Sequence, residues 1–142
     1  MKPLLGALLP LALLAAIPAH AQQWEELRRN EQVRLSIDPK SIRARGDEVS
    51  FRYLVDYRET QGDYKTALYR SLATRATIRC KARAIATRQS EGYGGNEAKG
   101  PVTGVLKPTK QESGFKKLEQ GTSDEDLWKR VCEKKAAPAA KK

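Results

Sequence analysis

The chain has 142 residues, of which 27 are Lys or Arg and 17 are Asp or Glu, so its formal net charge is +10 at pH 7. Hydrophobic residues make up 39% of the sequence and aromatic residues 6%, which is enough for one modest core and excludes a multidomain protein. The excess of positive charge favours partners that carry negative charge.

Residues 1–21 have the pattern of a cleavable secretory signal. Lys2 supplies the positive start, residues 4–17 are almost wholly apolar, and small residues precede a cleavage site after Ala21. The apolar run is shorter than the roughly 20 residues that cross a bilayer as a helix, so an uncleaved anchor is the weaker alternative. We therefore expect a periplasmic or secreted protein that begins at Gln22 and has no transmembrane segment after cleavage.

The predicted signal contains His20, the only histidine of the sequence. Without imidazole, the remaining chain has no Ser-His-Asp or Cys-His nucleophile system and no histidine-containing zinc site. Carboxylate pairs such as Glu25 with Glu26, or Asp56 with Glu59, lie among basic residues that keep them ionised, and we interpret them as solvated surface charge. The sequence thus predicts a protein that is not an enzyme and holds no metal or cofactor.

Cys80 and Cys132 are the only two cysteines, and export would place them in an oxidising compartment. Two cysteines cannot complete a zinc site by themselves, and their wide separation is not the C-x-x-C spacing of a redox motif. We therefore predict a structural disulfide between them.

The first predicted strand covers residues 31–38, where apolar and polar residues alternate. A turn over residues 38–41, which includes Pro39, is expected to end this strand. The clearest alternation follows over residues 49–57 and predicts the next strand. Residues 59–65 are expected to form the turn after it.

Residues 68–87 keep apolar side chains at even positions over a length that exceeds a normal strand. We therefore predict a bend, a bulge or a tight turn at residues 80–83. A loop is expected over residues 89–100. Residues 101–106 and 114–118 are short strand candidates.

The last predicted element is a helix that Thr122 caps, with Glu125 completing a capping box. Its apolar stripe is expected to pack on the sheet, and it consists of Leu127, Trp128, Val131 and Cys132. The predicted fold is α+β, with an antiparallel sheet of about five or six strands packed on one C-terminal helix and tied by a single disulfide. The domain spans residues 22–135, and residues 136–142 are expected to form a mobile basic tail.

The order of these landmarks resembles the surface-adhesin protein E family of small exported bacterial proteins. The matching residues are 37–42 (Ile-Asp-Pro-Lys-Ser-Ile), the strand at 49–57, the Tyr69-Arg70-Ser71 segment, Cys80, Leu127 and Cys132. The resemblance implies a two-layer fold, the Cys80–Cys132 bridge and a non-enzymatic role, with adhesion to host matrix proteins in the member that names the family. That member looks lipid-anchored, whereas this sequence has no cysteine at its predicted cleavage site.

Seven basic residues and no acidic one lie between Asp63 and Glu91, which is the densest positive stretch of the chain. The predicted ligand-binding residues come from this stretch, with Tyr69 as a flat contact beside the cations: Arg75, Arg79, Lys81 and Arg83. The expected partner is an acidic protein, an anionic glycan or a lipid headgroup, or a host matrix protein by resemblance.

Two alternatives stand beside this binding hypothesis. The cations could instead only solvate an exposed sheet face and protect its edges. The chain could also be a structural or assembly protein of the cell envelope that acts through homodimer formation across exposed strand edges. Nucleic acid is a weaker partner because few aromatic residues are interleaved with the cations and because the expected compartment argues against it.

Overall fold

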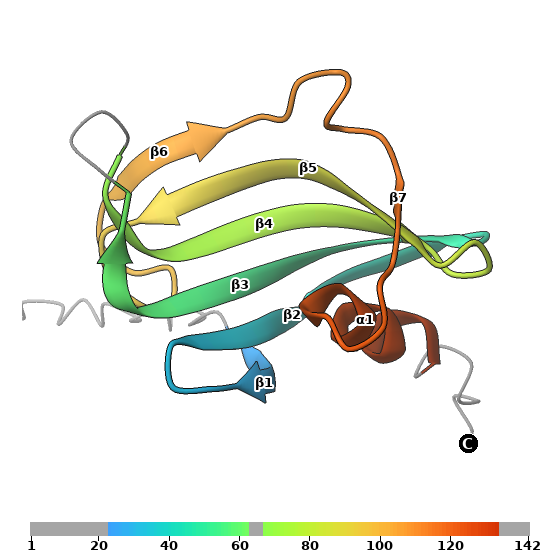
Figure 1. Ribbon diagram of the computed structural model, residues 1–142, viewed down its shortest axis with the longest axis horizontal. Helices are drawn as coiled ribbons and strands as arrows, with labels where there is room; N and C mark the ends of the chain where they lie inside the picture. The colour runs from blue at the N-terminus through green and yellow to red at the C-terminus, as the bar shows by residue number, and fades with distance from the viewer. Residues whose placement is uncertain (1–22, 63–66, 134–142) are drawn as a thin grey trace, which may run out of the picture.

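The computed structural model describes residues 23–62 and 67–133, so the predicted signal and the predicted tail lie outside the described residues. The elements, in chain order, are β1 (Glu25–Arg29), β2 (Val33–Arg45), β3 (Glu48–Gln61), β4 (Tyr69–Arg79), β5 (Ala84–Tyr93), β6 (Val102–Leu106), β7 (Lys116–Lys117), α1 (Ser123–Trp128) and a π-helical turn (Lys129–Glu133). Figure 1 shows one curved sheet with α1 lying across one of its faces.

The sheet is antiparallel, and its strands follow the order of the sequence, β1-β2-β3-β4-β5-β6. The short β7 pairs with the beginning of β5, where Lys117 faces Ala84 and Lys116 faces Ile85. The predicted α+β fold, an antiparallel sheet with one C-terminal helix, is therefore confirmed, and β7 adds a strand of two residues to it.

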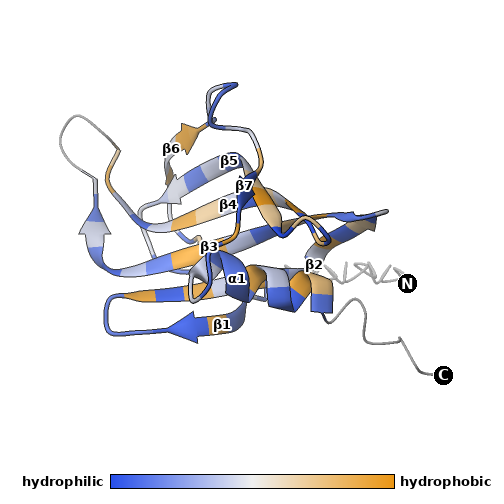
Figure 2. Ribbon diagram, turned by 45° about the vertical axis from the view of Figure 1, so that its right-hand side comes forward, coloured by the Kyte–Doolittle hydropathy of each residue, from blue (hydrophilic) through white to orange (hydrophobic). Residues whose placement is uncertain are grey.

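The core lies between the sheet and the helical segment. Apolar and polar residues alternate along the long strands, as the hydropathy colours of Figure 2 show, so one face of each strand is apolar. That face meets the predicted stripe of the helical segment, and the buried cluster consists of Leu35, Ile37, Val49, Phe51, Ala76, Ile78, Ile85, Leu127, Val131 and Cys132. Tyr53 packs against the same cluster, as its shared phase with Val49 and Phe51 predicts.

The predicted disulfide is present, and it joins the sheet to the helical segment. Cys80 follows β4 and Cys132 lies in the π-helical turn, with their Cα atoms 5.7 Å apart. A second contact lies beside the bridge, because the indole Nε1–H of Trp128 donates to the carbonyl oxygen of Cys80 at 3.0 Å. The sulfur bridge and this hydrogen bond fix the end of the helix to the turn after β4.

The predicted turn at residues 38–41 does not end the strand that precedes it, because β2 continues to Arg45. Its local hydrogen bonds do form, because Lys40 N–H donates to the Asp38 carboxylate at 3.0 Å and the Ser41 hydroxyl donates to the Asp38 carbonyl at 2.7 Å. Ser41 Oγ also accepts from Arg52 N–H of β3 at 2.7 Å, so the segment stays attached to the sheet. The result is a bulge inside β2, and the chain reverses only at Gly46.

Other predicted features also differ from the structure, and β3 continues to Gln61, into the turn expected at residues 59–65. The strand β1 was not predicted, and the expected loop at 89–100 is shorter because β5 continues to Tyr93. The capping box is also incomplete, since the Thr122 side chain makes no capping hydrogen bond and its hydroxyl donates to the backbone carbonyl of Glu119. Glu125 accepts instead from Gly121 N–H at 2.9 Å, which lowers the pKa of the Glu125 carboxyl. The expected tight turn at 80–83 is confirmed.

Candidate functional site

The structure divides the four predicted basic residues between a strand and a turn. Arg75 and Arg79 lie on β4, and their register places them on the sheet face opposite Ala76 and Ile78 of the core. Lys81 and Arg83 lie in the following turn, where Arg83 adopts a left-handed backbone with φ of 49°. The four side chains therefore do not form one continuous row.

Arg79 contacts an aromatic ring and an acid. Its guanidinium carbon lies 3.8 Å from the centre of the Phe115 ring, and its Nε donates to Glu48 at 3.0 Å. Arg88 lies over the same ring at 5.3 Å, so Phe115 is covered by two cations. Arg79 thus packs the segment before β7 onto the sheet as well as carrying charge.

Arg83 makes the corresponding contacts on the helix side. Its guanidinium carbon lies 4.0 Å from the centre of the Trp128 ring, and Nη2 donates to Glu125 at 3.0 Å. Trp128 is hydrogen-bonded to the carbonyl oxygen of Cys80, so these contacts join the turn, the helix and the disulfide in one cluster. Part of the Arg83 charge is therefore balanced within the molecule.

The remaining predicted residues lie apart from this cluster. Lys81 and Arg75 are exposed, and neither side chain has an acidic partner among the described residues. Tyr69 begins β4, at the other end of the strand from Cys80, and its ring meets Tyr57 edge-on at 5.7 Å between centres. The five predicted ligand-binding residues are therefore not brought together at one point.

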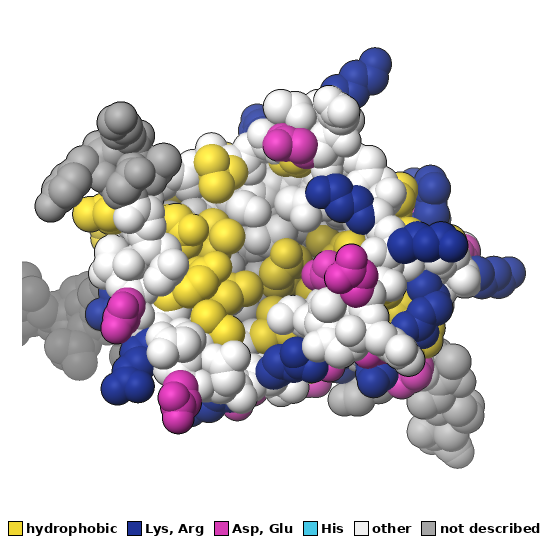
Figure 3. Space-filling view, in the orientation of Figure 1, with side chains coloured by type: hydrophobic (Ala, Val, Ile, Leu, Met, Phe, Trp, Pro, Cys, Tyr) yellow, Lys and Arg dark blue, Asp and Glu magenta, His cyan; other side chains and the backbone are white. Residues whose placement is uncertain are grey.

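The turn after β4 nevertheless lies in a strongly basic region. The β2–β3 turn is adjacent, because Cys80 N–H donates to the Asp47 carbonyl at 3.0 Å, and β7 lies on the other side against β5. Six cations gather here and form what we call the basic end: Arg45, Arg79, Lys81, Arg83, Lys116 and Lys117. Figure 3 shows Lys and Arg side chains gathered at this end of the molecule.

Sequence reasoning missed three members of the basic end, which are Arg45, Lys116 and Lys117. Two adjacent lysines before Leu118 are visible in the sequence, but their pairing with β5 is a non-local contact that periodicity does not reveal. The nearby acids are Asp47, Glu48 and Glu125, and two further acids, Glu112 and Asp124, interact with Lys116. The Asp47 carboxylate accepts from the backbone N–H of Lys81 at 3.0 Å, so it shapes the turn.

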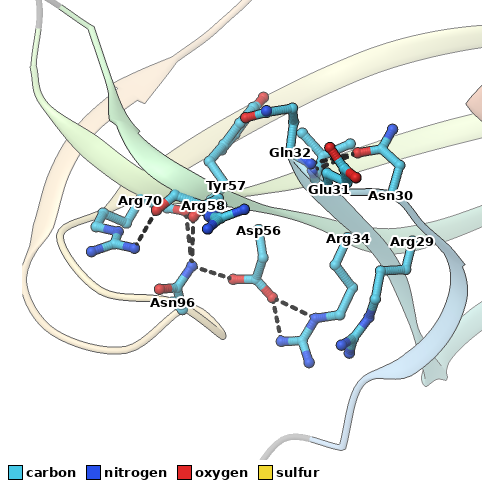
Figure 4. A pocket seen from close by; sticks show the side chains of 11 residues that line it. Arg29, Asn30, Glu31, Gln32, Arg34, Asp56, Tyr57, Arg58, Arg70 and Asn96 are labelled. Atoms are coloured by element: carbon cyan, nitrogen blue, oxygen red, sulfur yellow. Dashed lines mark hydrogen bonds and ion pairs between the residues drawn. The ribbon is translucent and has the colours of Figure 1, made fainter.

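A different arrangement lies at the opposite end of the sheet, around Asp56 (Figure 4). The sequence predicts Asp56 as solvated surface charge, but its exposed fraction is 5%. Its carboxylate accepts from Arg34 Nε at 3.1 Å and from the backbone N–H of Glu97 at 2.6 Å. The hydrogen bond with the Asp56 carboxylate raises the pKa of the Arg34 guanidinium. The surface prediction is wrong because β2 and the segment after β5 cover this face, which strand alternation alone does not indicate.

The segment after β5 is held against Asp56 by several polar contacts. Asn96 Nδ2 donates to the Tyr57 carbonyl at 3.1 Å, and the Ser71 hydroxyl donates to the Gly95 carbonyl at 2.6 Å. Glu97 and Ala98 are both in the left-handed region, with φ of 60° and 56°. The left-handed backbone conformation is energetically unfavourable for residues other than glycine. The contacts with Asp56, Tyr57 and Ser71 therefore hold the segment in a conformation that it would not adopt by itself.

Residues 24–133 match the family model described as surface-adhesin protein E. The chain belongs to the surface-adhesin protein E family. A comparison with curated protein sequences gives no match.

Solved structures of Haemophilus influenzae protein E have the same fold. Its crystal form II gives a TM-score of 0.62 at 18% identity, covering 78% of this chain and 87% of that chain. Protein E from non-typeable Haemophilus influenzae gives a TM-score of 0.60 at 16% identity, covering 89% of this chain and 87% of that chain. At these identities the likeness establishes the fold alone.

Membership of the protein E family, together with the disulfide, indicates an extracytoplasmic protein. Across residues 23–62 and 67–133, no three His, Cys, Asp or Glu side chains come together in a way that could hold a metal ion. No helix in the described part of the chain is long and apolar enough to cross a membrane.

Proposed function

We propose that this protein E family member is a non-enzymatic binding module, exported after cleavage at Ala21, that holds an anionic partner through its basic end. The partner would be an acidic protein, an anionic glycan or a lipid headgroup, and the family description as a surface adhesin supports a host matrix protein among these. The absence of a lipidation cysteine at the cleavage site suggests that the protein is released into the periplasm or secreted.

The observation that carries this proposal is the clustering of six cations from three separate segments at one end of the sheet. Lys81, Lys116 and Lys117 are exposed and form no ion pair within the described residues, so their side chains face solvent. Glu112 and Asp124 are close enough to interact with Lys116 but balance only part of this charge. Neighbouring cations raise the local concentration of an anionic partner and speed its association. The disulfide at the same end holds the turn that presents them.

The test is adsorption of the purified protein to heparin-agarose and elution with increasing salt. We choose the triple variant Lys81→Gln, Lys116→Gln and Lys117→Gln because these side chains stack on no aromatic ring of the described residues, unlike Arg79 and Arg83. Elution of the parent protein should require more salt than elution of the triple variant, since exposed charges are screened at physiological ionic strength.

The matched control removes three exposed lysines outside the basic end that form no ion pair within the described residues, with Lys40→Gln, Lys107→Gln and Lys110→Gln. It should elute close to the parent protein. If the control and the basic-end variant elute together, net charge alone explains adsorption and the basic end is not the site.

A second candidate function is assembly through β6. This strand is an edge of the sheet, and it contains no charged residue and no proline that would discourage pairing with another strand. Val102, Val105 and Leu106 are 54%, 51% and 62% exposed. The opposite edge, β1, is by contrast rich in charge. These features favour β6 as the place where a second copy would add a strand.

A further inference from the structure

A second cluster of cations lies at the end of the sheet opposite the basic end, and all of its members are arginines. They line an open pocket of about 270 Å³ that Figure 4 shows from close by, here called the arginine pocket: Arg29, Arg34, Arg58 and Arg70. Arg58 lies about ten residues along β3 from Glu48, or roughly 33 Å. The two basic regions are therefore separate sites.

Strand register brings these arginines together, one from each of β1 to β4. Arg29 lies directly opposite Arg34, and Arg34 lies opposite Asp56. The pairing of β3 with β4 shifts register after Asp56, and Arg58 and Arg70 lie at this irregularity. Like charges placed opposite each other on paired strands repel. The arrangement is therefore unfavourable unless negative charge is close to it.

Acidic side chains balance only two of the four. Arg34 pairs with Asp56, and Arg29 pairs with Glu26 at 2.7 Å. In the part of the chain that the structure describes, no carboxylate lies within ion-pair distance of Arg58 or Arg70. Glu31 also lines the pocket, but within the described residues it forms no ion pair with Arg58 or Arg70. The part of the pocket between β3 and β4 thus keeps uncompensated positive charge.

Arg70 is held in place before any ligand enters. Its Nη2 donates to the carbonyl oxygen of Arg58 at 2.6 Å, which fixes the guanidinium against β3. Its Nε–H is buried and finds no acceptor among the described residues. This N–H has no accessible surface, so an anion in the pocket can reach Arg70 only through the N–H groups of Nη1 and Nη2. Asn96 also lines the pocket, and its Nδ2 donates to the Arg70 carbonyl oxygen at 3.3 Å, which holds this side of the pocket in place.

The residue type indicates the ligand chemistry. A guanidinium presents a planar fork of donors that suits anions with several oxygens, whereas the basic end uses lysines as well, which act as point charges. The arginines come from neighbouring strands, so their donors approach the pocket from more than one direction. A phosphate group offers three or four acceptor oxygens, while a carboxylate offers two. We propose that the arginine pocket binds a phosphate group, free or as a monoester, between Arg58 and Arg70.

The test follows the side-chain Nε–H resonances of Arg58 and Arg70 by NMR as inorganic phosphate or glycerol phosphate is added at constant ionic strength. Both resonances should shift and saturate with at least one of the two probes. A response to both places the recognition in the phosphate group, and a response to glycerol phosphate alone assigns the site to monoesters. Arg58→Gln should weaken binding by about tenfold or more, because a charge-assisted contact is lost.

The control is Lys107→Gln, an exposed lysine outside the pocket that removes the same charge, and it should change the affinity by less than about twofold. Arg70→Gln provides a second variant, checked for an unchanged melting temperature. The triple lysine variant of the basic end should bind phosphate as the parent protein does, which separates this inference from the proposed function. The inference fails if neither probe gives a saturable shift, or if Arg58→Gln and Lys107→Gln weaken binding equally.

Discussion

Individual side chains in this protein often serve packing and charge together. Arg79 and Arg83 each cover an aromatic ring and pair with an acid, so replacing either would remove a contact as well as a charge. Asp56 is a second example, because the sequence predicts a surface carboxylate and the structure shows a buried one that accepts hydrogen bonds from two separate segments. The chemistry of a residue here depends on neighbours that are distant in the sequence.

Tyr53 gives a prediction at this scale. Burial raises the pKa of its phenol from 10.0 to about 12, so the folded state resists ionisation that the unfolded chain allows. Its contribution to stability is complete below pH 10 and is lost as the pH rises from 10 toward 12, with a total of about 2 kcal/mol. Urea unfolding across this pH range should show the decline.

The comparison for Tyr53 is Tyr53→Phe, which should be less sensitive to pH over the same interval. Burial also raises the pKa of Tyr57 and Tyr93, so absorbance of tyrosinate should show several late groups, of which the Tyr53→Phe variant lacks one. If the variant and the parent lose stability in parallel between pH 10 and 12, the Tyr53 phenol is not the group responsible.

The elements of the fold follow from local sequence patterns wherever alternation or an apolar stripe is strong. The sequence correctly predicts the strand at 49–57 and the stripe of Leu127 and Val131, because the spacing of apolar residues decides which side chains are buried there. It also correctly predicts the tight turn at 80–83, because the apolar pattern is too long for one strand. The edge strand β1 has few apolar residues and depends on pairing with β2, which its sequence does not indicate. The bulge in β2 is likewise settled by Ser41 contacting β3.

The disulfide gives the prediction at the scale of elements. Replacing Cys80 and Cys132 with alanine should lower stability by up to about 4 kcal/mol, because the open chain regains the entropy of a long loop. The melting temperature should then fall by about 10–20 °C. Circular dichroism during heating measures the change.

Reduction of the parent protein should reproduce the effect of the double alanine variant, and reductant should leave that variant unchanged. Two reactive thiols in the native, unreduced protein, or an unaltered melting temperature after reduction, would contradict the structural role of the bridge.

Across the whole molecule, the two ends of the sheet differ in how far sequence could foresee them. The basic end is half predicted, because Arg79, Lys81 and Arg83 are close in sequence while Lys116 and Lys117 arrive through β7. The arginine pocket is not foreseen at all, since its members come from four strands and meet only through their register. Sites built by long-range pairing need the topology before they can be recognised.

Assembly through β6 is the prediction for the whole molecule. If a second copy pairs with this edge, sedimentation velocity should show a dimer that increases with protein concentration, and Val105→Lys should abolish it. Gln32→Lys, at an exposed position between β1 and β2, adds the same charge and should leave the dimer intact. A monomer at all concentrations would remove assembly from consideration.

The bridge between Cys80 and Cys132 also encloses β5, β6, β7 and the exposed segment at 107–112 within one covalent ring. A protease that cuts this segment, after Lys110 for example, would open the ring without releasing either fragment. Outside the cytoplasm, where extracellular proteases act, a nicked molecule could therefore keep both of its charged ends joined.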